Sequence, residues 1–255
     1  MGPDPKTSAP LLGEHDLDPD FLRAWRRGDE DLARDLAIEI HPGVFELRVL
    51  SPSWCSRLLA EVEEIEARAE REGRELQRPN SMNEYGLILD QVGFEPVLRE
   101  LRERWLAPLT GLFFPHCGGA ELDGHHGFVV DYGRERDVDL GFHVDDSEVT
   151  LNLCLEGGDD LRGSELVFRG VRCYRHQQVP DDEEEWFEYV HEPGVLLLHA
   201  GKHRHQVEPL RRGRRRNMIL WLQSSAYRER VGVPEVECPD WCPVEAGRVQ
   251  QRRLG

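Results

Sequence analysis

The chain has 255 residues, and its 49 acidic and 32 basic side chains give a net charge of −17 at pH 7. That charge argues against a general nucleic-acid binder, which normally carries a basic surface. No apolar run approaches the roughly 18 residues of a membrane span, and the N-terminus lacks the basic-then-apolar pattern of a secretion signal. The six cysteines are scattered, which is typical of reduced thiols. We therefore expect a cytoplasmic protein built around one large domain.

One cysteine pair is close in sequence, Cys238 and Cys242. Its spacing would serve as half of a zinc site, but such a site needs four ligands. No second Cys/His pair lies nearby along the chain. The sequence therefore disfavours a structural zinc ion, and the role of this pair stays open.

The first half of the chain places apolar residues mainly at helical spacing, after a polar tail over residues 1–14. One helix is expected from Asp18, with Ile38 on its apolar face, before His41-Pro42-Gly43 breaks it. Ser51 stands where it would cap the N-terminus of the next helix. The further elements expected in this half are a strand over 44–50 and helices over 54–71 and 95–109.

After these helices the sequence changes to short apolar strands separated by glycine-containing turns. Helices followed by such strands predict an α+β fold, in which a double-stranded β-helix (jelly roll) core carries N-terminal helices packed against it. We divide the chain into a tail and helical lead-in over 1–40, a main domain over 41–228 and a C-terminal extension over 229–255. The strands are expected over 127–132, 149–155, 164–168, 194–199 and 217–222.

Metal-ligating residue types gather in two segments. His143 and Asp145 form an H-x-D pair on an extended segment, where residues two apart point to the same face. One more histidine from a distant strand would complete two histidines and one carboxylate, a set that suits non-haem Fe(II) with open positions. His199, His203 and His205 are the candidates, and alternation alone does not choose among them.

The residues that follow His205 favour it as the third ligand. They read H-x-V-x-P-x-x-x-G-x-R and end at Arg215, with an apolar strand behind. A guanidinium at this place offers two charge-assisted hydrogen bonds to a carboxylate. Within the run Arg211–Arg216 we expect only Arg215 to point inward, with Arg216 on the opposite face and the exposed arginines solvated.

Other polar segments have plainer interpretations. His125-His126 are expected to play a structural or supporting role rather than to bind metal. Asn80, Asn83 and Tyr85 would either line the mouth of a substrate site or form a turn. The acidic run 181–185 is expected to be a solvated loop, and its role stays open.

Together these motifs resemble the prolyl 4-hydroxylase-like 2-oxoglutarate/Fe(II) dioxygenases. The closer match is to the 2-oxoglutarate and iron-dependent oxygenase domain-containing protein 2 type. The resemblance covers roughly residues 40–228, and the combined motifs are specific although each is short. Besides the motifs already described, the segments that carry it are 78–86, 128–132, 143–152 and 217–222.

The resemblance implies a set of site residues. Arg215 would pair with the distal carboxylate of 2-oxoglutarate, and Tyr132 would reach the same cosubstrate. Relatives often have two glycines before the Glu165-Leu166 pair, and here Ser164 replaces the second. The implied iron ligands are His143, Asp145 and His205, and the implied cosubstrate residues are Arg215, Tyr132 and Leu166.

The implied reaction is hydroxylation of a C–H bond in a small-molecule or peptide substrate, such as a prolyl or lysyl side chain, with release of succinate and CO₂. Fe(II), 2-oxoglutarate and O₂ are the implied cofactors, ascorbate is a candidate stimulant, and neither nucleic acid nor membrane is an expected partner. One alternative is a cupin-type metal dioxygenase without 2-oxoglutarate, which would not need Arg215. The other is a catalytically silent jelly-roll binding module, which the intact ligand set disfavours.

Overall fold

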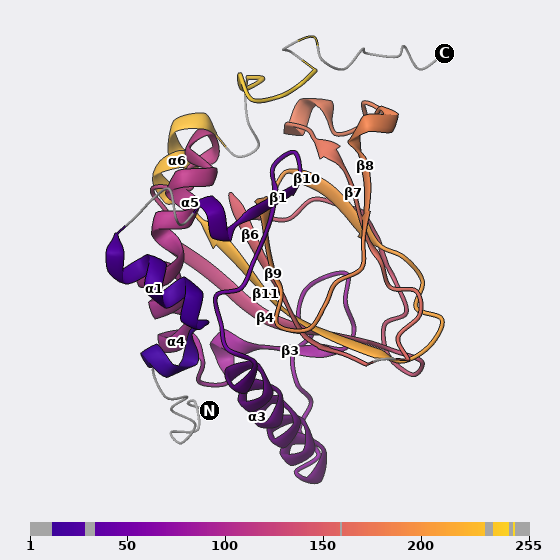
Figure 1. Ribbon diagram of the computed structural model, residues 1–255. Coiled ribbons are helices and arrows are strands. Elements are labelled where there is room, and N and C mark those ends of the chain that lie inside the picture. Colours follow the sequence, from indigo (N-terminus) through magenta and orange to yellow (C-terminus); the bar gives the residue numbers. More distant parts are fainter. Residues whose placement is uncertain (1–11, 29–33, 159, 233–236, 245–246, 248–255) are drawn as a thin grey trace.

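A computed structural model describes residues 12–28, 34–158, 160–232, 237–244 and 247. Two antiparallel sheets face each other, and helices pack on the outer side of the larger sheet (Figure 1). The expected α+β jelly roll is therefore confirmed. The larger sheet contains β1 (Ile38–His41), β2 (Val44–Leu47), β3 (Gly86–Ile88), β4 (Gly124–Gly133), β6 (Val149–Gly157), β9 (Leu196–Ala200) and β11 (Arg214–Gln223), and the smaller contains β5 (Leu140–His143), β7 (Leu166–Val171), β8 (Trp186–Tyr189) and β10 (His203–Val207).

The strand order is β1-β2-β9-β6-β11-β4-β3 in the larger sheet and β5-β10-β7-β8 in the smaller. This order interleaves strands from distant parts of the chain. Residues of the H-x-D segment and of the later histidine segment consequently meet in the smaller sheet, where β10 pairs with β5. The described residues contain no helix that is both long and apolar enough to cross a membrane.

The helices begin and end where local chemistry predicts, with one exception. The Ser51 side chain caps α3 by accepting a hydrogen bond from the Trp54 amide at 3.3 Å. The helix expected from Asp18 is confirmed over α1, but it does not continue to Ile38, because Gly28 takes a left-handed φ of 61° and ends it. Ile38 instead opens a strand and is 59% exposed. The helices are α1 (Pro19–Arg27), α3 (Pro52–Arg71), α4 (Glu95–Glu100), a π-helical stretch (Leu101–Leu106), α5 (Ala107–Phe113) and α6 (Ser225–Val231).

The larger sheet lies between two apolar cores, and successive side chains along its strands point alternately into one core and the other. On β11, Met218, Leu220 and Leu222 are fully buried in the core that also holds the helices. Ile219 and Trp221 point the other way and pack in the core between the two sheets. Because side chains alternate along a strand, Arg215 and Asn217 share the inner face with Ile219 and Trp221. The inside of the β-helix is thus where polar residues interrupt an apolar lining.

Candidate active site

The three predicted metal ligands converge between the sheets. His143 ends β5 and lies directly opposite His205 of β10, so the two imidazoles are neighbours across the ladder. Their ring centroids are 4.2 Å apart. The backbone amide of Asp145 donates to the carbonyl of Gly201 at 2.9 Å, which holds the carboxylate beside both rings. One ligand atom from each of the three residues lies within 4.8 Å of the others.

Hydrogen bonds prepare both imidazoles to bind a metal. Nδ1 of His143 lies 2.8 Å from the carbonyl oxygen of Gly141, and Nδ1 of His205 lies 2.9 Å from that of His203. A carbonyl only accepts, so each Nδ1 carries the proton and donates it. Each Nε2 then carries a free lone pair. Nε2 of His143 lies 3.6 Å from one carboxylate oxygen of Asp145, and Nε2 of His205 lies 3.8 Å from the other. The donor set therefore fits a divalent metal ion.

The electrostatics of the group point the same way. Burial would raise the pKa of Asp145, but the neighbouring His205 and His143 outweigh burial and hold it below its ordinary value. Burial, followed by the effect of His143, lowers the pKa of His205 to about 3. Burial would also lower the pKa of His143, but the Asp145 carboxylate outweighs it and raises that pKa. An ionised carboxylate and a neutral His205 are the forms that bind metal.

The other two histidine candidates lie outside this group. The ring of His199 projects from β9 of the larger sheet, and its Nδ1 faces the carbonyl of Ala200 at 2.9 Å. His203 packs its ring against Phe168 and against the ring of His41. Sequence alternation left the choice open, and the pairing of β10 with β5 brings His205 to the H-x-D pair.

Arg215 lies in the same interior, on β11 directly opposite Tyr132 of β4. Its side chain is 1% exposed, and its guanidinium carbon is 5.0 Å from the centre of the Tyr132 ring. One guanidinium nitrogen donates to the carbonyl of Ser164, while Nε has no partner. No described carboxylate forms an ion pair with Arg215. A buried cation without a counter-ion is costly, so the arrangement favours an anionic ligand.

One small cavity joins all the predicted site residues. Asn80 and Asn83 also border it, and Asn83 reaches both the Tyr132 hydroxyl at 3.4 Å and Asp137 at 3.1 Å. The predicted residues among its lining are His143, Asp145, His205, Arg215, Tyr132 and Leu166.

Several polar residues of this cavity were not singled out from the sequence. Thr150 donates a 2.6 Å hydrogen bond to Oδ2 of Asp145, and it fixes the orientation of that carboxylate. Asn217 donates to Asn152 at 2.7 Å and lies 3.0 Å from Nδ1 of His191, which is also buried. The alternation of β6 and β11 was the signal that could have found them, because polar residues at every second position interrupt apolar strands.

The His125-His126 pair and Tyr85 lie away from the three predicted ligands. His125 and His126 contact Asp90 at 3.4 and 3.0 Å, away from the ligand group, which confirms a structural role. Tyr85 does not line this cavity, and its ring instead faces the guanidinium of Arg136 at 5.2 Å.

The arginine run departs from the expectation in one respect. Arg216 is on the face opposite Arg215, as expected, but it is buried rather than solvated. It forms 2.7 Å ion pairs with Glu156 and Glu63. Arg214 likewise pairs with Asp131 at 2.6 Å. The run therefore supplies internal ion pairs along β11.

The acidic run 181–185 is not merely solvated. Asp181 forms two hydrogen bonds with Arg169, at 2.9 and 3.0 Å. Glu185 forms two with the fully buried Arg172, both at 2.6 Å. The loop is therefore attached to β7 and to the segment that follows it.

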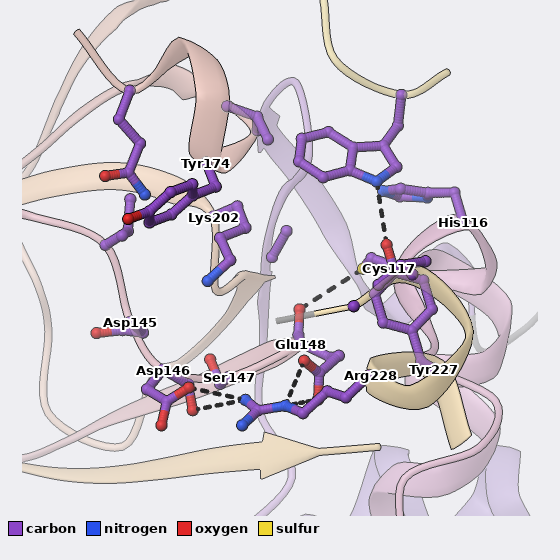
Figure 2. Close-up of a pocket in the computed structure, with 17 residues that line it drawn as sticks. His116, Cys117, Asp145, Asp146, Ser147, Glu148, Tyr174, Lys202, Tyr227 and Arg228 are labelled. Carbon is purple, nitrogen blue, oxygen red and sulfur yellow. Dashed lines mark hydrogen bonds and ion pairs between the residues drawn. The ribbon is translucent and has the colours of Figure 1, made fainter. Parts of the chain in front are cut away.

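A larger cavity of about 290 Å³ lies on the other side of Asp145. Figure 2 shows Asp145 at its edge, with Tyr174 and Lys202 along one wall. Arg228 forms the opposite wall, where it bonds to Glu148. Asp145 is thus the residue that borders both cavities.

Comparison with known proteins yields a family and a fold. A family model described as the OGFOD2-like domain matches residues 11–119. The 2-oxoglutarate and iron-dependent oxygenase domain-containing protein CP2 of Arabidopsis thaliana is 45% identical over 224 residues, which are 88% of this chain and 56% of that protein. The 2-oxoglutarate and iron-dependent oxygenase domain-containing protein 2 of Homo sapiens is 38% identical over 200 residues, 78% of this chain and 52% of that protein. The chain thus spans about half the length of these curated relatives.

A solved structure extends the comparison to the fold. The prolyl hydroxylase of Trichoplax adhaerens, in complex with a hypoxia inducible factor oxygen degradation domain peptide fragment, superposes with a TM-score of 0.54 at 16% identity. The match covers 80% of this chain and 95% of the hydroxylase. The fold and the inward His/Asp/His group define a double-stranded β-helix protein of the 2-oxoglutarate/Fe(II) oxygenase fold. Within that class the chain is a homologue of the 2-oxoglutarate and iron-dependent oxygenase domain-containing proteins, so the resemblance in its sequence is confirmed.

Proposed function

We propose that this protein is an Fe(II)- and 2-oxoglutarate-dependent dioxygenase that hydroxylates a C–H bond and releases succinate and CO₂. The observation that carries the proposal is the buried guanidinium of Arg215, which has no counter-ion among the described residues and borders the same cavity as the three ligands. A cupin-type dioxygenase would have no use for such a cation. A silent binding module would not need two histidines with their Nε2 lone pairs directed at a carboxylate.

Each proposed role follows from position. His143, Asp145 and His205 would hold the iron, and Thr150 would keep the carboxylate oriented. Fe(II) held by these residues would supply O₂ activation together with the keto acid. The Arg215 fork would anchor the distal carboxylate of 2-oxoglutarate.

Two neutral side chains complete the proposed cosubstrate pocket. Leu166 would close an apolar wall of the cavity. The Tyr132 hydroxyl would donate to the cosubstrate as a neutral phenol, because burial raises its pKa to about 12.

The substrate is proposed to enter the larger cavity beside Asp145. Its volume of about 290 Å³ suits a small molecule or a peptide side chain. Lys202 and Arg228 place cationic groups on its walls, and Arg228 is already paired with Glu148 and Asp146. The prolyl hydroxylase of the structural comparison holds a peptide fragment, which is consistent with either class of substrate.

Four further expectations remain proposals. We propose a cytoplasmic location, which agrees with six cysteines that form no disulfide. The acidic charge supports the absence of nucleic-acid and membrane partners. The division at residues 40/41 and 228/229, with ascorbate as a candidate stimulant, stays a prediction.

The test separates binding from turnover. Purified protein is loaded with Fe(II) without oxygen, 2-oxoglutarate binding is measured by calorimetry, and succinate is measured after oxygen is admitted. We expect metal-dependent binding of 2-oxoglutarate and slow succinate release without a substrate. His143→Ala should abolish both. Calorimetry without any heat of 2-oxoglutarate binding would favour the cupin-type alternative, and loss of metal binding as well would favour the silent module.

A further inference from the structure

A second group of metal-ligating side chains lies apart from the Asp145 site. It consists of Cys173, His176, Cys238 and Cys242, and one ligand atom from each lies within 4.8 Å of all the others. Cys173 and His176 flank a short turn after β7, whereas Cys238 and Cys242 lie in the described segment 237–244. Sequence reasoning noted only the second pair, because the partner pair is 65 residues away along the chain.

The distances within this group match a tetrahedral zinc site. Zinc binds sulfur at about 2.3 Å and imidazole nitrogen at about 2.0–2.1 Å, so tetrahedral geometry places two sulfurs ~3.8 Å apart and a sulfur and a nitrogen ~3.5 Å apart. The sulfurs of Cys173 and Cys238 are 3.7 Å apart. Nδ1 of His176 is 3.3, 3.5 and 3.5 Å from the sulfurs of Cys173, Cys238 and Cys242.

Hydrogen bonding alone does not account for this arrangement. A neutral imidazole nitrogen has one lone pair or one proton, so Nδ1 of His176 cannot satisfy three thiols at once. A disulfide does not account for it either, because a bonded pair of sulfurs lies at about 2.05 Å. A metal ion at the centre would bring four ligand atoms together at these separations. Both pairs also have chelate spacing, Cys-x-x-His and Cys-x-x-x-Cys.

One half of the site is fixed to the sheets by its own hydrogen bonds. The carbonyls of Gln177 and Val179, just after His176, accept hydrogen bonds from Arg204 of β10 at 3.3 and 2.7 Å. The backbone amide of Arg172, next to Cys173, donates to the carbonyl of Lys202 at 3.3 Å. A prepared pair of ligands on a rigid loop lowers the entropy cost of binding the metal.

The other half lies on a segment that has little regular structure or apolar packing to hold it in place. The described residues 237–244 form neither helix nor strand. The apolar cluster there is small and consists of Cys173, Cys242 and Val244, with a few partly buried neighbours. The indole nitrogen of Trp241 donates to the Tyr227 hydroxyl at 3.2 Å. Small clusters of this size are commonly stabilised by a metal rather than by apolar burial.

We propose that Cys173, His176, Cys238 and Cys242 bind one structural zinc ion that fixes segment 237–244 against the turn after β7. Four protein ligands leave no open position, so the ion would have a structural role. Tyr174 and Trp241 adjoin these ligands and border the larger cavity beside Asp145 (Figure 2). The zinc would therefore also shape a wall of the substrate cavity, a consequence that rests on the proposed function, whereas zinc binding itself does not.

The first experiment counts zinc in a background that has lost the other metal site. The full chain carrying Asp145→Ala is purified under reducing conditions, equilibrated with zinc, freed of loosely bound metal by gel filtration and analysed by mass spectrometry for metals. We expect about one zinc per chain. Adding Cys238→Ser should reduce zinc to near zero. Adding Cys55→Ser should leave it unchanged, because Cys55 is a buried thiol of α3 outside the group.

A second measurement keeps the proposal testable if Cys238→Ser fails to fold. Cobalt(II) is titrated into the chelator-stripped Asp145→Ala protein, whose four proposed ligands are all intact. We expect saturation near one equivalent, with a thiolate charge-transfer band and the intense visible bands of tetrahedral cobalt. Reduced, folded protein without those bands and without bound zinc would overturn the proposal. So would a Cys173–Cys238 disulfide found by mass in protein that was never exposed to oxidant.

Discussion

The unpaired charge of Arg215 makes a prediction in which stability and binding change in opposite directions. The guanidinium is 1% exposed, and among the described residues it has one hydrogen-bond acceptor, the Ser164 carbonyl. Replacing a buried ion pair by apolar residues of similar volume is often stabilising by about 1–4 kcal/mol, and a buried charge without a partner has no ion-pair attraction to offset its desolvation. The lost bond to Ser164 subtracts roughly 1 kcal/mol. Arg215→Met should therefore stabilise the ligand-free protein by up to about 3 kcal/mol.

The same substitution should remove most of the affinity for 2-oxoglutarate. Breaking a buried, hydrogen-bonded ion pair by removing one partner costs about 3–5 kcal/mol. At about 1.4 kcal/mol for each factor of ten, that loss corresponds to an affinity decrease of roughly 10²–10³-fold. Arg215→Lys should lie between the two, because an ammonium keeps the charge without the planar fork.

Denaturant unfolding and anaerobic calorimetry with 2-oxoglutarate measure the two effects. Arg216→Met is the matched control, because Arg216 is the next residue of β11 and equally buried but is paired with Glu156 and Glu63 on the opposite face. That control should be destabilised and should bind 2-oxoglutarate normally. The reasoning is refuted if Arg215→Met binds 2-oxoglutarate as tightly as the wild-type chain, or if it is destabilised as much as Arg216→Met.

Substitutions at three further positions test other parts of the site. Thr150→Val removes the 2.6 Å bond to Asp145 and should weaken metal binding, measured by Mn(II) titration, by roughly 10–100-fold. Ser164 takes a left-handed φ of 66°, so Ser164→Gly should stabilise the protein by about 0.5–1 kcal/mol in denaturant unfolding, while Ser164→Val should destabilise it. Burial, followed by Arg215, lowers the pKa of His191 to about 3, so the unfolded chain binds the proton first. Stability is then fully present above pH 6.5 and is lost as pH falls from 6.5 toward 3, by about 1 kcal/mol at pH 5.5. In His191→Gln, the free energy of unfolding should therefore fall less between pH 7 and pH 5.5 than it does in the wild-type chain.

Each of these has an outcome that contradicts it. Unchanged Mn(II) affinity in Thr150→Val would mean that the carboxylate is held by its backbone alone. A Ser164→Gly protein no more stable than wild type would show that the left-handed backbone carries no strain. Equal pH slopes for His191→Gln and wild type would place the acid sensitivity in the other buried histidines.

The larger sheet could be predicted because each of its long strands faces two apolar cores. Met218, Leu220 and Leu222 bury one face of β11 while Ile219 and Trp221 bury the other, so the strand reads as a continuous apolar run. The sequence therefore predicted the strand and also the inward direction of Arg215. Periodicity alone did not decide which of three histidines is the third ligand. The motif that joins His205 to Arg215, and the family resemblance, favoured His205.

The smaller sheet was mostly missed because its strands are polar where they form the site. β10 reads His-Arg-His-Gln-Val, and β5 contains a glycine and an exposed Phe142. Strand propensity reflects the packing of apolar side chains, which these segments lack. The Cys173–His176 pair was missed for a different reason, since spacing along the chain cannot indicate that a distant C-terminal segment returns to the same turn.

One turn connects the two groups of metal-ligating residues. The carbonyl of Gly201 accepts from the amide of Asp145, and the carbonyl of the next residue, Lys202, accepts from the amide of Arg172, beside Cys173. A Cβ at Gly201 would lie 2.0 Å from the carbonyl oxygen of Ser147, so a side chain there would push the turn off the Asp145 loop. Because both ligand groups are bonded to this turn, a segment 237–244 fixed by zinc would also be held in place relative to the proposed iron site. A substrate lying between them would therefore meet a cavity whose two ends are fixed relative to each other.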